Sequence, residues 1–475
     1  MRRRTSSTDQ WAVRSAATLS RAPPWVPSGF ASLPAGDVLL RNARVPAALI
    51  VAPGLAAEGP WVDCDLTIAG GRIAAITPPR TLTDGPPPVE LDRGIVLPRL
   101  VDIHTHIDKG HIVPRHANPD GTHGGARESV AADRSAHWSA EDVSRRMDFS
   151  LRCAYAHGTG ALRTHIDSIG PQTAISWPVF AEMRAAWQDR IALQAVSIFA
   201  VDMAIDDEPQ FRALVDTVAR HGGLLGGLTF LGEPPGPKLA AALDRIFAAA
   251  TAHGLDLDFH VDESHSPDAR SLGAIAEAAL RHRFRGTIVV GHCCSLALCP
   301  DAERADTIAK VRDAGIAVVA LPMCNMYLQD RQGGRTPRWR GVAPLHELHA
   351  AGVRVMVASD NTRDPFYAYG DLDLIEVFRE ATRILHFDHC DTPWITTVGT
   401  TPAEVMRLPA QGRIAEGRRG DLVLTRARSF DELLARPQSD RVVLVGGKQI
   451  DTALPDYREL DDLMVRPPGA VPRAC

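Results

Sequence analysis

The sequence predicts an α/β fold, a (β/α)8 TIM-type barrel with a small β-sandwich domain formed by the two segments that flank it. From residue 96 onward, short apolar runs rich in β-branched residues alternate with longer amphipathic stretches. Eight such runs occur: IVLPRLVDIHTH, GALRTHID, IALQAVSIF, LLGGLTFLG, LDLDFHVDE, GTIVVGHCC, IAVVALPMCN and VRVMVASDN. Because no GxGxxG fingerprint follows any of them, the alternation favours a closed barrel over an open doubly wound sheet.

The amphipathic stretches between the runs carry helix start and stop signals. In SAEDVSRRMDFSLRCAYAHG, Ser139 and Asp142 form an N-terminal cap pair and Gly158 marks the end. The stretches KLAAALDRIFAAATAHG and SLGAIAEAALRHRFRG have the same layout, and DLDLIEVFREATRIL follows the eighth run. These stretches are predicted to form helices between the strands.

Two flanking segments, residues 37–95 and 411–475, surround the barrel that we expect over 96–410. Both contain short strand-like runs, and the pair Gly70–Gly71 is a hairpin signal. Neither flank alone can bury an apolar face, so we expect them to pair into one small β-domain, followed by a C-terminal tail. Residues 1–36 begin with an Arg/Ser-rich stretch that no apolar segment follows, and we expect a disordered extension there.

The composition argues against several classes of function. The chain has 52 Lys and Arg against 57 Asp and Glu, a net charge of −5, which gives no electrostatic basis for binding nucleic acid or an anionic membrane. No apolar run reaches the length of about 18 residues that a membrane-spanning helix needs. The eight cysteines are scattered, several of them within apolar runs, as Cys324 is. This is typical of reduced cysteine and predicts a cytoplasmic location.

Polar side chains gather where the predicted strands end, and in this fold the carboxyl ends of the strands carry the active site. The residues at these ends are His104, His106, Arg163, His165, His260, Glu263, His292, Asp360 and Asn361. Buried strand ends would otherwise carry Val or Ile. We therefore expect a functional site at this rim of the barrel.

The pair His104 and His106 is the first part of a predicted metal site. Side chains two residues apart on a strand face the same side, so both imidazoles can converge on one ion. The pair alone is a weak signal, but His260 and Asp360 at the ends of two other strands strengthen it over the alternative of satisfied core histidines. Three imidazoles and one carboxylate suit one divalent ion, Zn²⁺ or Fe²⁺.

Glu263 is the predicted proton shuttle beside this site. It follows the ligand His260 by three residues in HVDE, and a carboxylate next to a metal, but not bound to it, can move protons. Asp262 is the competing acid. Strand alternation directs its side chain away from that of His260, so we favour Glu263.

Six motifs of the chain resemble those of the cytosine deaminase branch of the amidohydrolase superfamily: HTHID, RTHID, HVDE, GHCCS, NMYLQDR and SDNTRDPF. The resemblance covers essentially the whole barrel. It implies a single metal held by His104, His106, His260 and Asp360, with Glu263 as the shuttle. It also implies that His292 orients or polarises the attacking hydroxide, with Asp360 beside it, and that Phe366 lies against the substrate ring.

Three features of the sequence narrow what the resemblance implies about the metal site and the substrate. Related two-metal barrels bridge their ions with a modified lysine on strand four, and GLLGGLTFLG has no lysine, so a mononuclear site is expected. Cytosine deaminases carry a glutamine after strand three that reads the amide edge of the base, where this chain has Ala200. The second acid of their strand-eight pair is here Asn361. The changes leave the identity of the heterocycle open.

The function that follows is hydrolytic deamination, with ammonia release, of a cyclic amidine such as cytosine or a related amino-heterocycle. Substrate contacts are expected from Phe366, Asn361, Arg163 and His165. The alternatives are a mononuclear amidohydrolase that cleaves an amide or displaces another leaving group and, less favoured, a non-catalytic scaffold. The predicted partner is a small heterocycle, and the sequence leaves a homo-oligomer open.

The long Gly/Pro-punctuated stretch Asp108–Trp138 leads away from the first strand. Connections of this length in a compact domain are often functional, so a lid over the barrel mouth is a reasonable interpretation. His111, His116 and His123 lie in this stretch. As residues of an irregular loop they are expected to face solvent or substrate, and Lys109 is expected to be a loop charge or a substrate contact.

Overall fold

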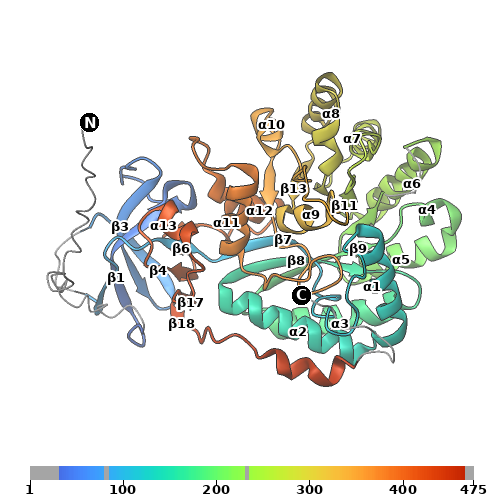
Figure 1. The fold of residues 1–475 in the computed structure, drawn as a ribbon. Helices are drawn as coiled ribbons and strands as arrows, with labels where there is room; N and C mark the ends of the chain where they lie inside the picture. Colours follow the sequence, from blue (N-terminus) through green and yellow to red (C-terminus); the bar gives the residue numbers. More distant parts are fainter. Residues whose placement is uncertain (1–31, 80–84, 230–234, 466–475) are drawn as a thin grey trace, which may run out of the picture.

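The structure is a computed structural model and describes residues 32–79, 85–229 and 235–465. Most of the predicted N-terminal extension, residues 1–31, therefore lies outside the described residues, as does part of the fourth apolar run. The chain forms a strand-and-helix body and a smaller β-domain beside it, seen at the left of Figure 1.

Eight parallel strands form the centre of the larger body, as the eight apolar runs predict. They are β7 (Leu100–Thr105), β8 (Thr159–Asp167), β9 (Ala192–Ile198), β10 (Leu225–Leu228), β11 (Leu257–Val261), β12 (Ile288–His292), β13 (Ala317–Ala320) and β14 (Val355–Val357). Every residue of seven of them is buried or nearly so, which explains why the runs are continuously apolar instead of alternating.

The strands pair in sequence order as two parallel sheets, β7-β8-β9 and β10-β11-β12-β13-β14. Isolated parallel bridges join the two sheets at both places where their edge strands meet. Val196 pairs with Leu224 and Ala200 with Leu228 at one of them, while Thr105 pairs with Asp360 at the other. The fold is the TIM-type barrel that the sequence predicts.

Helices follow most of the strands and cover the outside of the barrel (Figure 1). The α-helices are α1 (His123–His137), α2 (Ala140–His157), α3 (Gln172–Trp187), α4 (Met203–Asp206), α5 (Glu208–Arg220), α6 (Pro237–His253), α7 (Ser271–His282), α8 (Asp301–Asp313), α9 (Pro322–Leu328), α10 (Leu345–Ala350), α11 (Leu374–Leu385), α12 (Thr400–Val405) and α13 (Phe430–Ala435). Short 3₁₀ turns are η2 (Ala47–Leu49), η3 (Cys294–Leu298), η4 (Trp394–Val398) and η5 (Tyr457–Leu463).

The predicted signals of α2 are confirmed atom by atom. The Ser139 hydroxyl accepts the backbone N–H of Asp142, and Gly158 ends the helix in the left-handed conformation at φ 93°. The later stretch SLGAIAEAALRHRFRG behaves differently, because α7 ends at His282 and Arg283, not a glycine, takes the left-handed position.

Two four-stranded sheets form the small β-domain. One contains β1 (Val38–Pro46), β3 (Trp61–Ala69), β4 (Arg72–Thr77) and β5 (Pro88–Glu90), and the other contains β6 (Val96–Pro98), β16 (Leu422–Leu424), β17 (Val442–Val445) and β18 (Lys448–Gln449). A further pair, β2 (Ile50–Val51) and β15 (Ile414–Ala415), joins the two flanks directly. Gly70 and Gly71 form the hairpin turn between β3 and β4, as predicted.

One apolar core lies between these sheets and draws on both flanks of the chain, for example Leu40 and Leu66 from the first and Leu422 and Leu444 from the second. The β6 strand pairs with β16, so the first residues of the segment predicted as barrel lie in this sheet. Beyond β18 the chain leaves the β-domain, and η5 packs against α2, below it in Figure 1.

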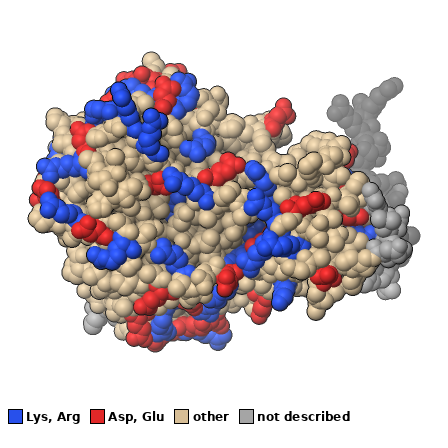
Figure 2. Space-filling view, turned by 180° about the vertical axis from the view of Figure 1, so that it is seen from behind, with Lys and Arg blue, Asp and Glu red and all other residues tan. Residues whose placement is uncertain are grey.

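The charged side chains agree with the balanced composition. On the face shown in Figure 2, basic and acidic groups are interspersed and no broad patch of one sign appears. Among the helices of the described ranges, none combines the length and the apolar character needed to span a bilayer.

Candidate metal centre and active site

The structure brings the four predicted ligands together at one end of the barrel. His104 lies near the end of β7 and His106 directly after it, His260 lies on β11, and Asp360 follows β14. The backbone N–H of Asp360 donates to the carbonyl of His104 at 2.9 Å, which holds two ligand-bearing segments in register. All four side chains are at most 5% exposed.

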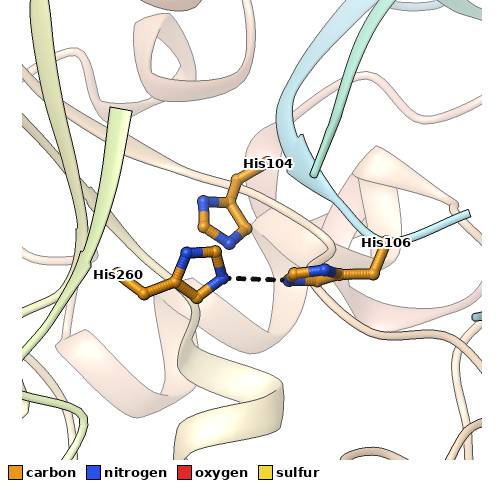
Figure 3. Close-up of side chains that lie close together, drawn as sticks. All are labelled: His104, His106 and His260. Atoms are coloured by element: carbon orange, nitrogen blue, oxygen red, sulfur yellow. Dashed lines mark hydrogen bonds between the residues drawn. The ribbon is translucent and has the colours of Figure 1, made fainter. Parts of the chain in front are cut away.

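The ligand atoms converge on a common point (Figure 3). The Nε2 atoms of His106 and His260 are 3.1 Å apart. The Oδ1 atom of Asp360 lies 3.3 Å from His106 Nε2 and 3.6 Å from His104 Nε2. One nitrogen from each of the three histidines lies within 4.8 Å of the others.

The donor atoms of this cluster fit a metal ion because they have few other partners: among the described residues, the only hydrogen-bond contact of Nε2 of His106 and of Nε2 of His260 is with each other. Both ring nitrogens of His104 and both carboxylate oxygens of Asp360 are buried and have no hydrogen-bond partner. Burial and the neighbouring cationic groups lower the pKa of each of the three histidines well below the ordinary value, so the rings are neutral, the form that binds metal. A divalent cation would satisfy all of these atoms at once.

A glycine leaves the space for the first candidate ligand, His104. A Cβ atom added to Gly291 on β12 would lie 2.8 Å from Cε1 of His104, closer than real Cβ atoms approach. The next residue, His292, and the candidate ligand Asp360 both have left-handed backbones, with φ of 71° and 63°. Such conformations concentrate at functional sites.

The carboxylate of Glu263 lies beside the ligands within a network of polar groups. Its Oε2 is 3.2 Å from Nε2 of His123, and its Oε1 accepts the Asn325 amide N–H at 3.2 Å and lies 3.5 Å from Nδ1 of His292. Burial raises the pKa of Glu263, but His292 and His123 lower it more, to about 2, so the carboxylate is ionised.

The competing acid, Asp262, points elsewhere. Its two oxygens accept the backbone N–H groups of Ser271 and Leu272 at the start of α7, at 2.9 and 3.0 Å. It therefore holds a helix end, whereas Glu263 contacts His292.

His292 ends β12 and is fully buried, and burial lowers its pKa. Its Nδ1 lies 2.9 Å from the side-chain nitrogen of Asn325, while its Nε2 has no partner. Asn325, on α9, thus bridges His292 and Glu263. Asn325 is not among the residues predicted from the strand ends, because it lies on the helix that follows β13, although it belongs to the motif NMYLQDR.

A cavity of about 450 Å³ opens above the candidate ligands. Its floor contains His106, His260 and Asp360, and Glu263 and His292 line it as well. The walls include Lys109, Ala200, Asn361 and Phe366, together with one face of α1 formed by His123, Gly124, Arg127, Glu128, Val130, Ala131 and Arg134.

The predicted substrate contacts divide into two groups. Phe366 and Asn361 line the cavity, and Ala200 presents only a methyl group where a glutamine was expected from the resemblance. Asn361 donates its amide to Asp364 Oδ2 at 2.6 Å, and Lys109 places its ammonium 4.7 Å from the centre of the Phe366 ring.

Arg163 and His165 are not among the residues that line the cavity. The guanidinium of Arg163 donates to Asp258 Oδ2 at 2.8 Å and to Gln194, and the His165 ring lies 4.0 Å from that of His104. Direct substrate contact by these two residues stays a prediction, and their position favours support of the ligands.

The stretch after the first strand is more ordered than predicted. Its second half is helix α1, which begins where the Thr122 hydroxyl accepts the N–H of Gly125. His111 does not face solvent, because its ring is buried against Phe149 at 4.7 Å. His116 contacts Asp133 at 3.0 Å, so His123 alone of the three lines the cavity.

Residues 140–451 match the model of the amidohydrolase family. A curated relative, pterin deaminase of Rhizobium rhizogenes (strain K84 / ATCC BAA-868), is 54% identical over 432 residues, covering 90% of this chain and 97% of that one. The chain belongs to the amidohydrolase family. A second relative, N-isopropylammelide isopropyl amidohydrolase of Pseudomonas sp. (strain ADP), is 24% identical over 77% of this chain and 88% of its own.

Solved structures share the fold of this amidohydrolase. The 5-methylcytosine deaminase of Klebsiella pneumoniae liganded with phosphonocytosine has a TM-score of 0.74 at 22% identity, over 87% of this chain and 97% of that one. The N-isopropylammelide isopropylaminohydrolase of Burkholderia multivorans ATCC 17616 has a TM-score of 0.70 at 26% identity, over 88% and 100%. These matches confirm the predicted barrel, and the family model together with the 54% identical relative confirms the predicted family.

Proposed function

We propose that this amidohydrolase is a hydrolytic deaminase with one divalent metal ion, and that its substrate is a pterin-like amino-heterocycle. The observation that carries the proposal is a buried cluster of three neutral histidines and one carboxylate beside a cavity that Glu263 also lines, in which His104 and Asp360 have no hydrogen-bond partner for their side-chain N and O atoms. The substrate class is supported by 54% identity to a protein named pterin deaminase.

The ligands of the ion would be His104, His106, His260 and Asp360, all of which offer an unshared electron pair toward one point. This N/O donor set suits Zn²⁺ or Fe²⁺. The absence of a lysine from the strand-four run GLLGGLTFLG supports a single ion. When bound, the metal supplies Lewis-acid chemistry and lowers the pKa of a water ligand toward 7.

Glu263 would then move the protons. It takes one from the attacking water and delivers it to a ring nitrogen next to the amino-bearing carbon, which makes that carbon electrophilic. His292 orients the attacking oxygen through its free Nε2, and Asn325 fixes the ring of His292 from the other side. The second proton of the attacking water would pass to the amino group, which leaves as ammonia while the oxygen that remains forms the ring carbonyl.

The shape of the cavity supports a ring larger than cytosine. A pterin is a bicyclic system whose pyrimidine half carries the exocyclic amine. Ala200 leaves free the volume that a glutamine side chain would occupy, and Phe366 offers an aromatic surface for a planar ring. The amino-heterocycle, whose identity the resemblance left open, is thus proposed to be pterin-like.

Ammonia release from a panel of pterin, cytosine, an aminotriazine and guanine tests the proposal, with metal content measured on each sample. We expect pterin to show the highest kcat/KM. The Glu263→Gln variant should retain its metal and lose about 10²- to 10⁴-fold in kcat. Full activity of this variant, or metal-loaded protein that releases no ammonia from any ring, would contradict the proposal.

A second candidate is hydrolytic removal of an alkylamine from a triazine, since two of the similar proteins bear that activity in their names. The same samples decide this by release of isopropylamine from N-isopropylammelide. The non-catalytic scaffold is disfavoured because the candidate ligands and Glu263 are all in place. The seven free cysteines among the described residues support the proposed cytoplasmic location.

A further inference from the structure

One histidine from outside the barrel strands contacts the proposed proton shuttle. His123 is the first residue of α1, and its Nε2 lies 3.2 Å from Oε2 of Glu263, 140 residues away in the sequence. The side chain of His123 is 28% exposed and that of Glu263 is 11% exposed. An ionised carboxylate only accepts hydrogen bonds, so Nε2 of His123 carries the proton and donates it.

The two oxygens of Glu263 have different partners. Asn325 donates to Oε1 from a short helix directly after a barrel strand, and His123 donates to Oε2 from α1. The terminal torsion of a glutamate side chain is broad, so a single donor leaves the carboxylate plane free to rotate. Two donors on opposite oxygens fix that plane, and each oxygen keeps a lone pair for a proton in transfer.

The segment that precedes His123 fixes the position of this residue. The side-chain amide of Asn118 donates to the carbonyls of Thr122 and Pro365, and the Thr122 hydroxyl caps α1. The His123 ring also packs edge-on against Phe366, with 5.4 Å between ring centres. This anchoring holds Nε2 toward Glu263 and ties it to the loop that carries Phe366.

We propose that His123 is a positioning residue for Glu263: its Nε2–H holds Oε2 so that the carboxylate is aligned for both proton transfers. The inference rests on the proposed deaminase function. It makes the alignment of the catalytic carboxylate depend on α1, an element outside the barrel strands.

The test uses two substitutions of His123 in the metal-loaded enzyme. His123→Leu removes the donor at similar volume, whereas His123→Gln can place an amide N–H near the position of Nε2. His253→Gln, at the exposed end of α6, is the matched control. We expect His123→Leu to lower kcat roughly 10- to 100-fold, the usual range for residues that orient an active group.

Three results distinguish positioning from other roles. We expect KM for pterin to change by less than about threefold in His123→Leu, and His123→Gln to restore most of kcat. Wild-type kcat in His123→Leu, equal losses in both variants, or an effect confined to KM would each overturn the inference.

A thermal unfolding cycle tests the contact without turnover. It compares wild type, His123→Leu, Glu263→Ala and the double variant, each with its metal content measured. If the hydrogen bond is present, the shift in unfolding midpoint of the double variant is smaller than the sum of the two single shifts. If wild type releases no ammonia from any ring, the proposed function is refuted. The unfolding cycle then tests by itself whether His123 contacts Glu263, and additive shifts would show that it does not.

Discussion

The two walls of the cavity differ in how their side chains are held. The candidate ligands His104 and His260 extend from barrel strands whose backbones are hydrogen-bonded to neighbours on both sides. The facing wall is α1, a single helix that enters through a capped turn and is tied to the barrel by a few side chains, such as Arg134 with Asp167 at 2.7 Å.

We therefore expect the two walls to have different roles, with the strand wall holding the metal and the α1 wall recognising the substrate ring. Metal ligands need fixed geometry, which strand ends supply, and the loss of one leaves a buried charge or ring unsatisfied. Recognition of the ring tolerates adjustment, which a tethered helix supplies. Substitutions in the strand wall should therefore affect metal retention. Those in the α1 wall beyond His123, which is proposed to position Glu263, should affect KM with the metal unchanged.

The largest effect is expected from removal of a strand-wall ligand. His106→Ala should lower metal affinity by more than about 100-fold, because residues that merely support metal ligands already contribute 10- to 100-fold. Metal content after dialysis and ammonia release from pterin measure this. A variant that keeps one equivalent of tightly bound metal would exclude His106 as a ligand.

A smaller effect should follow from filling the space beside a ligand. Gly291→Ala places a methyl group against His104, which must shift, so metal affinity should fall by roughly 10- to 100-fold. Gly273→Ala on α7 is the matched control, since its added Cβ meets only Thr307 Oγ1 at 3.9 Å. Equal metal affinity of both variants would show that the rigid strand wall does not constrain His104.

A substitution of Phe366 tests whether this residue contacts the substrate ring. Phe366→Ala should raise KM for pterin by about 2- to 10-fold, the equivalent of one aromatic contact, with metal content unchanged. The loss of metal from this variant would show that the loop after β14 supports the ligand Asp360 instead of the substrate.

The smallest effect is expected from loosening α1 at its far end. Arg134→Gln breaks the ion pair with Asp167 and should raise KM by no more than about fivefold, as for a pair worth up to about 1 kcal/mol. Arg145→Gln, which breaks an exposed pair with Asp462, is the control and should leave KM unchanged. A large fall in kcat for Arg134→Gln would mean that α1 acts in catalysis throughout its length.

The strand wall could be predicted from the sequence because two regularities place its residues. Side chains alternate along a strand, and all parallel strands of a barrel end at the same rim, so His104, His260 and Asp360 had to lie near one another. The sequence places β6 in the barrel because its VLP run continues into β7 without a break. The structure shows that β6 instead pairs with β16 in the small β-domain.

The α1 wall could not be predicted in the same way. The helix contains Gly124 and Gly125 in its first turn and many polar residues, which are typical of a loop. Its formation depends on the Thr122 cap and on contacts with distant segments, and no local pattern shows these. For the same reason the partnership of His123 with Glu263 is visible only in the folded chain.

Titration of metal-depleted protein with Zn²⁺ or Fe²⁺ tests the central claim most directly, with ammonia release from pterin as the readout. Activity should rise in proportion to added metal and stop rising at one equivalent per chain. Activity of the metal-depleted protein that does not change on titration, or a break at two equivalents, would contradict a single-ion deaminase.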